Sequence, residues 1–377
     1  MHMNIAFDAS DMCTGRADGT TRYTGELAKR LPELAKEIHW DFYGPCPVVR
    51  ERQGVPLKNV EWHASPFPGA WTQTRFAWEL FKNKPDVLFM PIQQLPIFRP
   101  HRTKTVAVIH DLAFHTYKEQ FRYKDWLLLH TFSAQVANEA DAIIAVSEAT
   151  KKDIEKYYGR THNVHVVHHG IDHDRFKIFS EEEKESGLKK LQEKYPDIKK
   201  PYILFVGQIQ PRKNIVRLVE AFEMLARQHG GSGLRLIIAG SHGWNNTEIY
   251  KRIAESPVRK NIVVTGAVPD ELLPTLYANA EVFVLPSLQE GFGIPLIEAA
   301  ACGIPIVTSN CSSMKEIVGD AGVLVDPKNS EAIAEGIQEA LQNKELYTKK
   351  SIHMASMFSW DKAAQETLRV LKEVTTL

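Results

Sequence analysis

The chain has 377 residues, 46 Lys+Arg against 46 Asp+Glu, a formal net charge of +0 and 44% hydrophobic residues. This length is typical of two domains, and the apolar content excludes a mainly disordered chain. The balanced charge argues against a nucleic-acid-binding protein, and no apolar run is long enough to span a membrane. The first residues lack a secretory signal pattern. The 4 cysteines are scattered, which predicts a reduced, cytoplasmic protein without a disulfide framework.

Apolar runs and amphipathic stretches alternate along the chain in two series. Helical spacing is clearest at 22–31 and 123–140. The alternation predicts an α/β fold with two Rossmann-like domains, each a parallel sheet covered by helices, and a ligand cleft at the carboxyl ends of the strands. The expected strands are 3–8, 86–90, 105–110, 142–146 and 164–168 in the first series, and 202–207, 234–239, 261–265, 282–285, 304–308 and 322–325 in the second.

A charged segment with few aromatic residues separates the two series and ends at Pro201. It predicts four parts: a first domain at 1–178, a polar helical connector at 179–200, a second domain at 201–356 and a terminal helix at 357–377. Ser359 fits the N-cap of that helix. Histidine is unevenly divided, because 12 of the 15 lie in the first half of the chain.

A glycine-containing loop follows the expected strand 282–285 and opens a helix. Gly291 and Gly293 let the backbone approach a ligand closely, and the free amides at the start of the helix suit an anion such as phosphate. Glu290 and Glu298 are hydrogen-bond acceptors for sugar or ribose hydroxyls, and we expect Glu298 in the first turn of the helix. The alternative is a tight strand–helix turn with two solvated glutamates.

A second loop, after the strand 202–207, carries the adjacent cations Arg212 and Lys213. An arginine binds phosphate oxygens in a bidentate manner and a lysine acts as a point charge. The alternative is a solvated pair. A carboxylate-bearing loop and a dicationic loop at strand ends of one α/β half together favour a nucleotide-diphosphate ligand.

These segments resemble the retaining GT-B glycosyltransferases, a large family that includes sucrose synthases and many mannosyl- and glucosyltransferases. The resemblance covers nearly the whole chain. Its motifs are the loop 212–214, the glutamates Glu290 and Glu298, the strand ends 108–112 and 146–148, the segment 170–176, the pair Arg22 and Tyr23, and the helix start 358–360. Within the family, the strand end 108–112 and the pair Arg22–Tyr23 look most similar to bacterial mannosyltransferases of surface-polysaccharide synthesis.

The resemblance implies roles for individual residues. Arg212 and Lys213 hold the donor diphosphate, Glu290 accepts from the donor sugar, Glu298 accepts from the ribose, and His110 faces the sugar. The implied catalytic set is Arg212, Lys213, Glu290 and His110. The implied donor-binding set is Gly207, Ser287, Gly291, Phe292, Gly293, Ile294, Leu296 and Glu298. The implied loop beside the diphosphate and the acceptor contains Gly15, Gly19 and Thr20.

The resemblance also implies the reaction: a hexose, with mannose from GDP-mannose favoured, is transferred with retention to a saccharide or lipid-linked saccharide, without a metal or other cofactor. It further implies that the terminal helix packs back on the first domain. The alternatives are UDP-glucose, UDP-galactose or UDP-N-acetylglucosamine as the donor, or a non-catalytic scaffold that binds sugar nucleotides. A nicotinamide oxidoreductase is disfavoured because no GxGxxG follows the first strand. The sequence does not predict the oligomeric state.

The first loop departs from the family pattern, because Arg16, Ala17 and Asp18 stand where relatives have a glycine pair. Asp18 would repel a diphosphate, so we expect it to face the acceptor or solvent. For His168–Gly170, where relatives often have an asparagine before the glycine, we expect a structural role.

Three further patterns suggest sites. Asp172–Asp174 is a DxD, but the phosphate roles are already assigned, so we do not expect a metal there. His162, His165 and His168 fall on alternating faces of a predicted strand, which disfavours a shared zinc. The stretch 99–126 interleaves basic and aromatic residues. It predicts either peripheral contact with the inner membrane face or a solvated helix face with its aromatics in the core.

Overall fold

The computed structural model describes residues 3–15, 19–46, 58–67, 69–228 and 233–376. The chain forms two compact units. The first consists of residues 1–116, 122–170 and 360–377, and the second of residues 117–121 and 171–359. Arg16, Ala17 and Asp18, about which the sequence raised specific expectations, lie outside the described residues, as do Met1 and His2.

The first unit is built on a sheet of seven parallel strands in the order β3-β2-β1-β4-β5-β6-β7. Five of these strands match the apolar runs, whereas β2 and β3 were not predicted and add an edge to the sheet. The strands are β1 (Asn4–Asp8), β2 (His39–Gly44), β3 (Val60–Ala64), β4 (Val87–Met90), β5 (Lys104–Ile109), β6 (Ala142–Ala145) and β7 (Val164–Val166).

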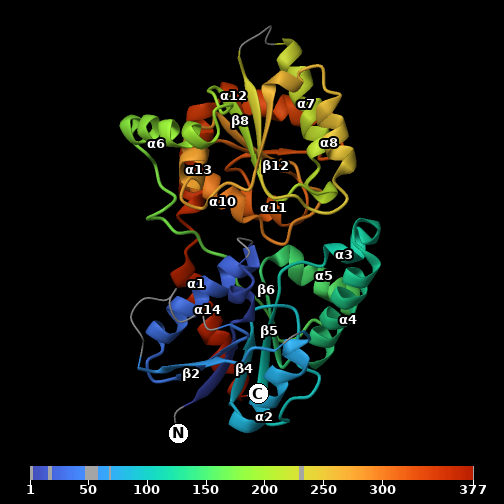
Figure 1. The fold of residues 1–377 in the computed structure, drawn as a ribbon, viewed down its shortest axis with the longest axis vertical. Coiled ribbons are helices and arrows are strands. Elements are labelled where there is room, and N and C mark those ends of the chain that lie inside the picture. Colours follow the sequence, from blue (N-terminus) through green and yellow to red (C-terminus); the bar gives the residue numbers. More distant parts are fainter. Residues whose placement is uncertain (1–2, 16–18, 47–57, 68, 229–232, 377) are drawn as a thin grey trace. The chain divides into compact units, whose positions relative to one another are not determined.

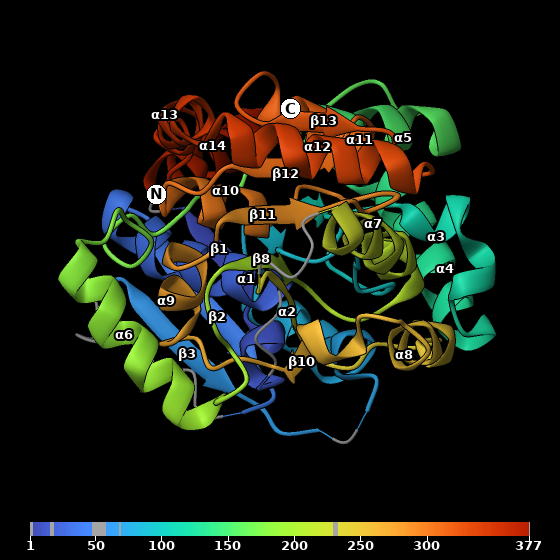
Figure 2. The ribbon, with the colours of Figure 1, turned by 90° about the horizontal axis from the view of Figure 1, so that it is seen from above.

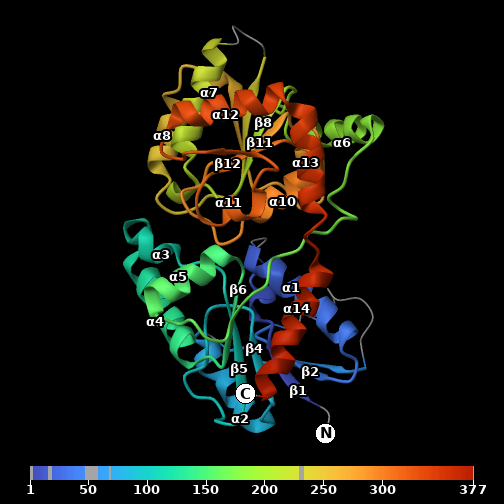
Figure 3. The same cartoon turned by 180° about the vertical axis from the view of Figure 1, so that it is seen from behind.

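Helices flank this sheet: α1 and α14 lie together on one side, and α3, α4 and α5 on the other (Figures 1 and 3). Ser147 caps α5, because its hydroxyl accepts the Thr150 N–H at 3.0 Å. The helices are α1 (Gly19–Leu34), α2 (Arg75–Asn83), α3 (Ala113–Thr116), α4 (Tyr123–Glu139), α5 (Glu148–Tyr158) and α14 (Trp360–Glu373), with short 3-10 turns at Ser10–Cys13, Trp71–Gln73 and Val374–Thr376. The 3-10 turn Lys118–Gln120 belongs to the second unit.

The terminal helix α14 belongs to the first unit, where it packs against α1. Trp360 is 2% exposed, and its ring stacks on His169 at 5.8 Å between centroids and meets the edge of Tyr23 at 6.2 Å. An ion pair between Arg30 and Asp361, 2.7 Å apart, adds a polar contact at the surface. Aromatic burial therefore holds the end of the chain in the first unit.

A disulfide joins Cys13 and Cys46, whose Cα atoms are 5.8 Å apart. The expectation of a chain without disulfides was wrong in this respect. The two cysteines are 33 residues apart in the sequence. They meet because β1 and β2 pair in parallel, so the segments that follow the two strands leave the sheet at the same, carboxyl end. Cys302 and Cys311 are free.

The second unit has six parallel strands in the order β10-β9-β8-β11-β12-β13. Figure 2 shows α7 and α8 on one flank of this sheet and α6, α9 and α10 on the other. The strands are β8 (Tyr202–Val206), β9 (Arg235–Ala239), β10 (Ile262–Gly266), β11 (Val282–Leu285), β12 (Ile306–Ser309) and β13 (Val323–Val325). The helices are α6 (Glu181–Lys194), α7 (Ile215–Gln228), α8 (Thr247–Ala254), α9 (Leu273–Ala278), α10 (Ile294–Ala301), α11 (Ser312–Val318), α12 (Ser330–Gln342) and α13 (Lys344–Ala355), with 3-10 turns at Pro211–Lys213 and Arg259–Asn261. The predicted α/β fold with two parallel sheets is confirmed.

The charged segment expected to be a polar helical connector does form a helix, α6, and this helix packs as part of the second unit. Ser180 and Glu183 form a capping box at the start of α6. Gly187 permits close packing on α9, because a Cβ there would lie 2.7 Å from the Thr275 hydroxyl. The segment 171–178 also belongs to this unit rather than to the first domain, since Phe176 is buried with its ring 6.0 Å from Tyr277.

Among the described residues, no helix combines the length and the apolar character needed to cross a bilayer.

We expect Trp360→Ala to lower the free energy of unfolding by about 3–5 kcal/mol, because it removes a large buried ring and leaves a cavity. Urea denaturation followed by circular dichroism measures this loss. Met357→Ala is the matched control, because Met357 lies three residues earlier and is 52% exposed. A loss for Trp360→Ala no larger than that of the control would contradict the packing assigned to the helix.

Candidate functional site

The dicationic loop lies in the second unit, in the 3-10 turn between β8 and α7. Asn214 ends this turn in the left-handed conformation, with φ 60°, which asparagine tolerates better than most residues. Its buried side-chain amide donates to the Pro286 carbonyl at 2.9 Å and to the Pro327 carbonyl at 2.6 Å. Asn214 therefore ties the dicationic loop to the glycine loop after β11, which sequence analysis did not anticipate.

The two loops meet at the buried carboxylate of Glu290. Its Oε1 accepts from Lys213 Nζ at 2.6 Å and from the Ser287 hydroxyl at 2.6 Å, while Arg212 Nη1 lies 3.4 Å from Oε2. Arg212 also donates to the Gln289 carbonyl at 2.8 Å. Burial raises the pKa of Glu290, but the charges of Lys213 and Arg212 and the hydrogen bonds from Lys213 and Ser287 outweigh it, so the pKa lies below its ordinary value. Four of the predicted site residues thus form one charged cluster.

Serine hydroxyls hold the backbone of the glycine loop in place. The Ser312 and Ser313 hydroxyls donate to the Glu290 carbonyl at 2.8 and 2.9 Å. The Ser309 hydroxyl donates to the Ser287 carbonyl at 2.7 Å. Sequence analysis missed these three residues, although a serine-rich segment after a strand is a recognisable signal for a turn that binds backbone groups.

Glycine is required at two turns of this region. Gly293 precedes α10 with φ 96°, and a Cβ there would lie 2.8 Å from Leu296 Cδ1. The Gly207 carbonyl lies so close to Gly240 that a Cβ on Gly240 would be 1.8 Å from it. Gly293 and Gly240 therefore exclude larger residues, and Gly293 sets the direction in which α10 begins.

The residues around Gly293 that the resemblance assigned to the donor fall on both sides of this helix start. Gly291 and Phe292 precede it, and Ile294 and Leu296 lie in its first turn. The Phe292 ring is 3% exposed and meets the Phe358 ring edge-on at 5.7 Å. Its side chain therefore packs in the core, and the contact of its backbone with the donor stays a prediction.

Glu298 lies in the second turn of α10, so the expectation of a first-turn position was wrong. The helix begins at Ile294, after the left-handed Gly293, and Glu298 is its fifth residue. Its side chain is 2% exposed and accepts from the Tyr277 hydroxyl at 2.8 Å. The role of Glu298 at the ribose stays a prediction.

In the first unit, His110 follows β5 at the carboxyl end of the sheet. Its Nε2 lies 2.8 Å from the Pro91 carbonyl, so Nε2 carries the proton. The ring meets Tyr23 edge-on at 5.1 Å and lies 5.6 Å from the His169 ring. Burial lowers the pKa of His169 well below its ordinary value, so a neutral imidazole packs beside His110. These contacts give His169 the structural role that the sequence predicted.

The predicted acceptor loop divides between two elements. Gly15, with φ 67°, follows the turn at Ser10–Cys13. Gly19 and Thr20 open α1, and the Thr20 carbonyl accepts from the Thr24 hydroxyl at 3.0 Å. Residues 16–18 between them lie outside the described part of the chain. The part of this loop that can be described is thus a helix start.

Asp8 is a candidate that sequence analysis missed. It ends β1 at the carboxyl edge of the sheet and is 1% exposed. Oδ1 accepts the Ser10 N–H at 2.9 Å, whereas the buried Oδ2 has no hydrogen-bond partner among the described residues. Burial raises the pKa of Asp8 to about 6, against smaller lowering effects of its hydrogen bonds with Ser10. A carboxyl group with this pKa changes its protonation near neutral pH.

The motifs that the sequence set aside have structural explanations. Asp172 Oδ1 accepts the backbone N–H groups of Asp174 and Arg175 at 3.0 and 3.2 Å, as in an Asx turn. His173 Nε2 lies 2.9 Å from the Phe358 carbonyl. The strand β7 is shorter than predicted and includes His165 but neither His162 nor His168.

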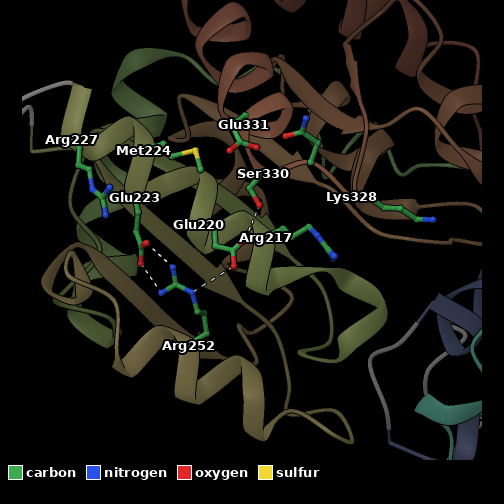
Figure 4. A pocket seen from close by; sticks show the side chains of 10 residues that line it. Arg217, Glu220, Glu223, Met224, Arg227, Arg252, Lys328, Ser330 and Glu331 are labelled. Carbon is green, nitrogen blue, oxygen red and sulfur yellow. Dashed lines mark hydrogen bonds and ion pairs between the residues drawn. The ribbon is translucent and has the colours of Figure 1, made fainter.

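A separate pocket of about 540 Å³ lies between α7, α8 and the start of α12 (Figure 4). Arg252 crosses it and donates to both carboxylate oxygens of Glu223, at 2.7 and 2.6 Å. The Ser330 hydroxyl donates to Glu220 at 2.6 Å. Charges of both signs line this pocket, with Arg252 paired to Glu223 and Glu220, so it does not share the cationic character of the loop at Arg212 and Lys213.

Residues 189–352 match the family described as glycosyl transferases group 1, and residues 17–175 match glycosyltransferase family 4. The O-antigen chain mannosyltransferase B of Escherichia coli is 31% identical, over 94% of this chain and 96% of that protein. The chain therefore belongs to the group 1 glycosyl transferases and is a glycosyltransferase.

Two further relatives extend the comparison. The GDP-mannose-dependent alpha-(1-6)-phosphatidylinositol monomannoside mannosyltransferase of Mycolicibacterium smegmatis is 27% identical, over 57% of this chain and 58% of that protein. The structure of sucrose-phosphate synthase from Thermosynechococcus elongatus matches with a TM-score of 0.75 at 19% identity, over 99% of both chains. The predicted GT-B fold is confirmed.

We expect Asp8→Asn to flatten the pH dependence of stability. Because its pKa is raised, Asp8 binds its proton more tightly in the folded chain than in the unfolded chain. Its contribution to the free energy of unfolding is therefore fully present below its ordinary pKa of 3.8 and is lost as the pH rises through about 6. At about 1.4 kcal/mol per pKa unit, the loss amounts to about 3 kcal/mol. Between pH 4 and pH 8, the free energy of unfolding of the variant should therefore rise by up to about 3 kcal/mol relative to that of the parent protein.

Urea unfolding at several pH values measures this difference. Asp125→Asn is the control, because Asp125 is an exposed carboxyl on α4. If both variants follow the parent protein across this range, Asp8 does not hold its proton as described.

Proposed function

We propose that this glycosyltransferase moves a mannosyl group from GDP-mannose to a saccharide or lipid-linked saccharide in polysaccharide or glycolipid synthesis. The observation that carries the proposal is the buried Glu290 carboxylate held between Lys213, Arg212 and Ser287. The named activities of the O-antigen and the phosphatidylinositol mannosyltransferases support mannose as the sugar. The competing donors are UDP-glucose, UDP-galactose and UDP-N-acetylglucosamine.

The charges of this cluster suit a diphosphate leaving group. Among these three side chains, Arg212 and Lys213 carry two positive charges against the one negative charge of Glu290. When the bond between the sugar and the diphosphate breaks, negative charge develops on the departing phosphate oxygen. Fixed cations stabilise that charge without reorganising. Glu290 accepts a hydrogen bond from a hydroxyl of the donor sugar and keeps the Lys213 ammonium in position.

The proposed chemistry retains the anomeric configuration. The bond from the anomeric carbon to the diphosphate oxygen breaks, the acceptor oxygen bonds to the same face of that carbon, and the acceptor proton passes to the departing phosphate oxygen. The proposed step uses no protein nucleophile, and Arg212 and Lys213 supply the positive charge without a metal ion. Orientation of donor and acceptor then accounts for much of the rate.

We expect Lys213→Ala to lower kcat for mannosyl transfer from GDP-mannose by about 100- to 1,000-fold, as the loss of one charge-stabilising donor usually does. Lys328→Ala is the control, since it removes a lysine of the same unit that lines the separate pocket. Transfer assays with and without excess chelator should give the same rates. Unchanged turnover in Lys213→Ala would falsify the assigned role.

The same assay separates the alternatives. Preferential turnover of a UDP-sugar would overturn the choice of donor and leave the role of the cluster intact. Slow hydrolysis of GDP-mannose without acceptor is expected of the enzyme. A non-catalytic scaffold should show neither hydrolysis nor transfer.

We also propose that the first unit contacts an anionic lipid surface through the start of α4. Tyr123, Leu127 and Leu128 are 69%, 45% and 53% exposed there, and the exposed cations Arg122 and Lys124 stand beside them. Exposed apolar side chains with adjacent basic residues suit the interface of an acidic membrane. This placement supports a site of contact at the inner membrane face.

We expect the double variant Tyr123→Ser, Leu128→Ser to bind vesicles that contain phosphatidylglycerol at least fivefold more weakly than the parent chain. Co-sedimentation with anionic and with neutral vesicles measures binding. The control is Leu346→Ser, which removes a 50% exposed leucine from the second unit. If the parent chain sediments equally with both kinds of vesicle, the membrane proposal fails.

A further inference from the structure

Two histidines and two carboxylates lie on one face of the neighbouring strands β2 and β3. His39 and Asp41 are two residues apart on β2, and Glu61 and His63 are two residues apart on β3, so each pair points to one side of its strand. The parallel register pairs Asp41 with Glu61. Four side chains that can bind a metal ion therefore share one small area of the sheet.

The polar atoms of these side chains converge. Asp41 Oδ1 lies 2.7 Å from His63 Nε2 and 3.5 Å from His39 Nε2. The Glu61 carboxylate lies 3.9 Å from each of the two Nε2 atoms. One ligand atom each from His39, Asp41 and Glu61 falls within 4.8 Å of the other two.

Two carboxylates meet in this cluster. Asp41 and Glu61 are adjacent on neighbouring strands, where like charges destabilise a sheet. No lysine or arginine pairs with either carboxylate in the described part of the chain, so only the two histidines oppose them. A divalent cation would neutralise the two carboxylates.

Asp41 adds a second argument, since it is only 4% exposed. Its Oδ1 accepts a hydrogen bond from His63 Nε2 at 2.7 Å. Asp41 is thus a buried carboxylate with the partly exposed His39 and the exposed carboxylate of Glu61 beside it. Buried charges are found paired or bound to metals.

We propose that His39, Asp41 and Glu61 bind a zinc ion. Nitrogen and oxygen ligands of this kind suit Zn²⁺, whose tetrahedral geometry sets ligand atoms about 3.3 Å apart. The separations of 3.5 and 3.9 Å around His39 Nε2 approach this value. His63 donates to Asp41 and orients it, as residues outside the ligand shell commonly do. A water molecule completes the tetrahedron.

The location separates this site from the glycosyl-transfer chemistry. His39 opens β2 at the amino end of the strands, whereas Asp8 and His110 lie at the carboxyl end of the same sheet. β3 is the edge strand of the sheet. The zinc ion would join this edge strand to β2, and it takes no part in the transfer reaction.

The test uses the untagged full-length chain, freed of metal with a chelator and titrated with zinc chloride by isothermal titration calorimetry at pH 7.5. We expect one Zn²⁺ per chain. Glu61→Gln should weaken binding at least tenfold, His39→Gln at least 100-fold, and His63→Gln about 10- to 100-fold, as for the loss of an orienting residue. Absorption of the Co²⁺-loaded chain should report tetrahedral coordination.

His101→Gln is the matched control, because it removes an exposed histidine of the first unit that lies outside the cluster. Its affinity for Zn²⁺ should equal that of the parent chain. The side chain of Glu61 is 62% exposed, so Glu61→Gln remains informative even if the His39 variant fails to fold. Parent-like affinity in Glu61→Gln and His39→Gln, or less than one Zn²⁺ bound per chain, would overturn the proposal.

Discussion

The buried carboxylate of Glu290 is the interaction on which the candidate site depends. A carboxylate at this depth is destabilising unless it is paired and hydrogen-bonded, and removing one partner of such a pair usually costs several kcal/mol. Lys213, Arg212 and Ser287 supply the partners. The loops that bear these residues must therefore keep their relative positions. Asn214 and the serines at the start of α11 fix those loops through backbone carbonyls.

The first unit depends in a comparable way on one aromatic cluster. The chain leaves this unit after Gly170 and returns at Trp360, and the stacked rings of His169 and Trp360 lie next to those two points. Tyr23 contacts both rings and His110 as well. The packing that anchors the returning helix therefore also surrounds the histidine expected to face the donor sugar. A substitution in this cluster would affect both stability and the placement of His110.

Sequence patterns predicted most of the fold because buried parallel strands are continuous apolar runs bounded by turns. β2 and β3 were not predicted, because polar residues interrupt their apolar runs: His39 and Asp41 in β2, and Glu61 and His63 in β3. The same four residues form the proposed zinc site, so local polarity concealed both the strands and the cluster. The dicationic loop with Arg212 and Lys213 and the glycine loop with Ser287 and Glu290 did predict residues that meet in space. They meet because each loop follows a parallel strand of the same sheet.

Other features depend on contacts between distant segments and could not be read from local patterns. The pKa of Asp8 depends on burial by the surrounding sheet, and the link between Cys13 and Cys46 depends on the pairing of β1 with β2. The position of Glu298 follows from the left-handed Gly293, which sets where α10 begins. The assignment of α6 to the second unit follows from Gly187, whose lack of a side chain permits contact with α9.

The zero net charge of the chain conceals two local imbalances of opposite sign. At Glu290 two cations surround one carboxylate, whereas Asp41 and Glu61 place two carboxylates side by side, with no lysine or arginine paired to them in the described part of the chain. At about 8 Å, the Debye length at physiological ionic strength is too short for the total charge to act across the protein. Ligand preference therefore follows from each local set of charges. Under the two proposals, the same chain attracts a diphosphate at one site and a divalent cation at the other.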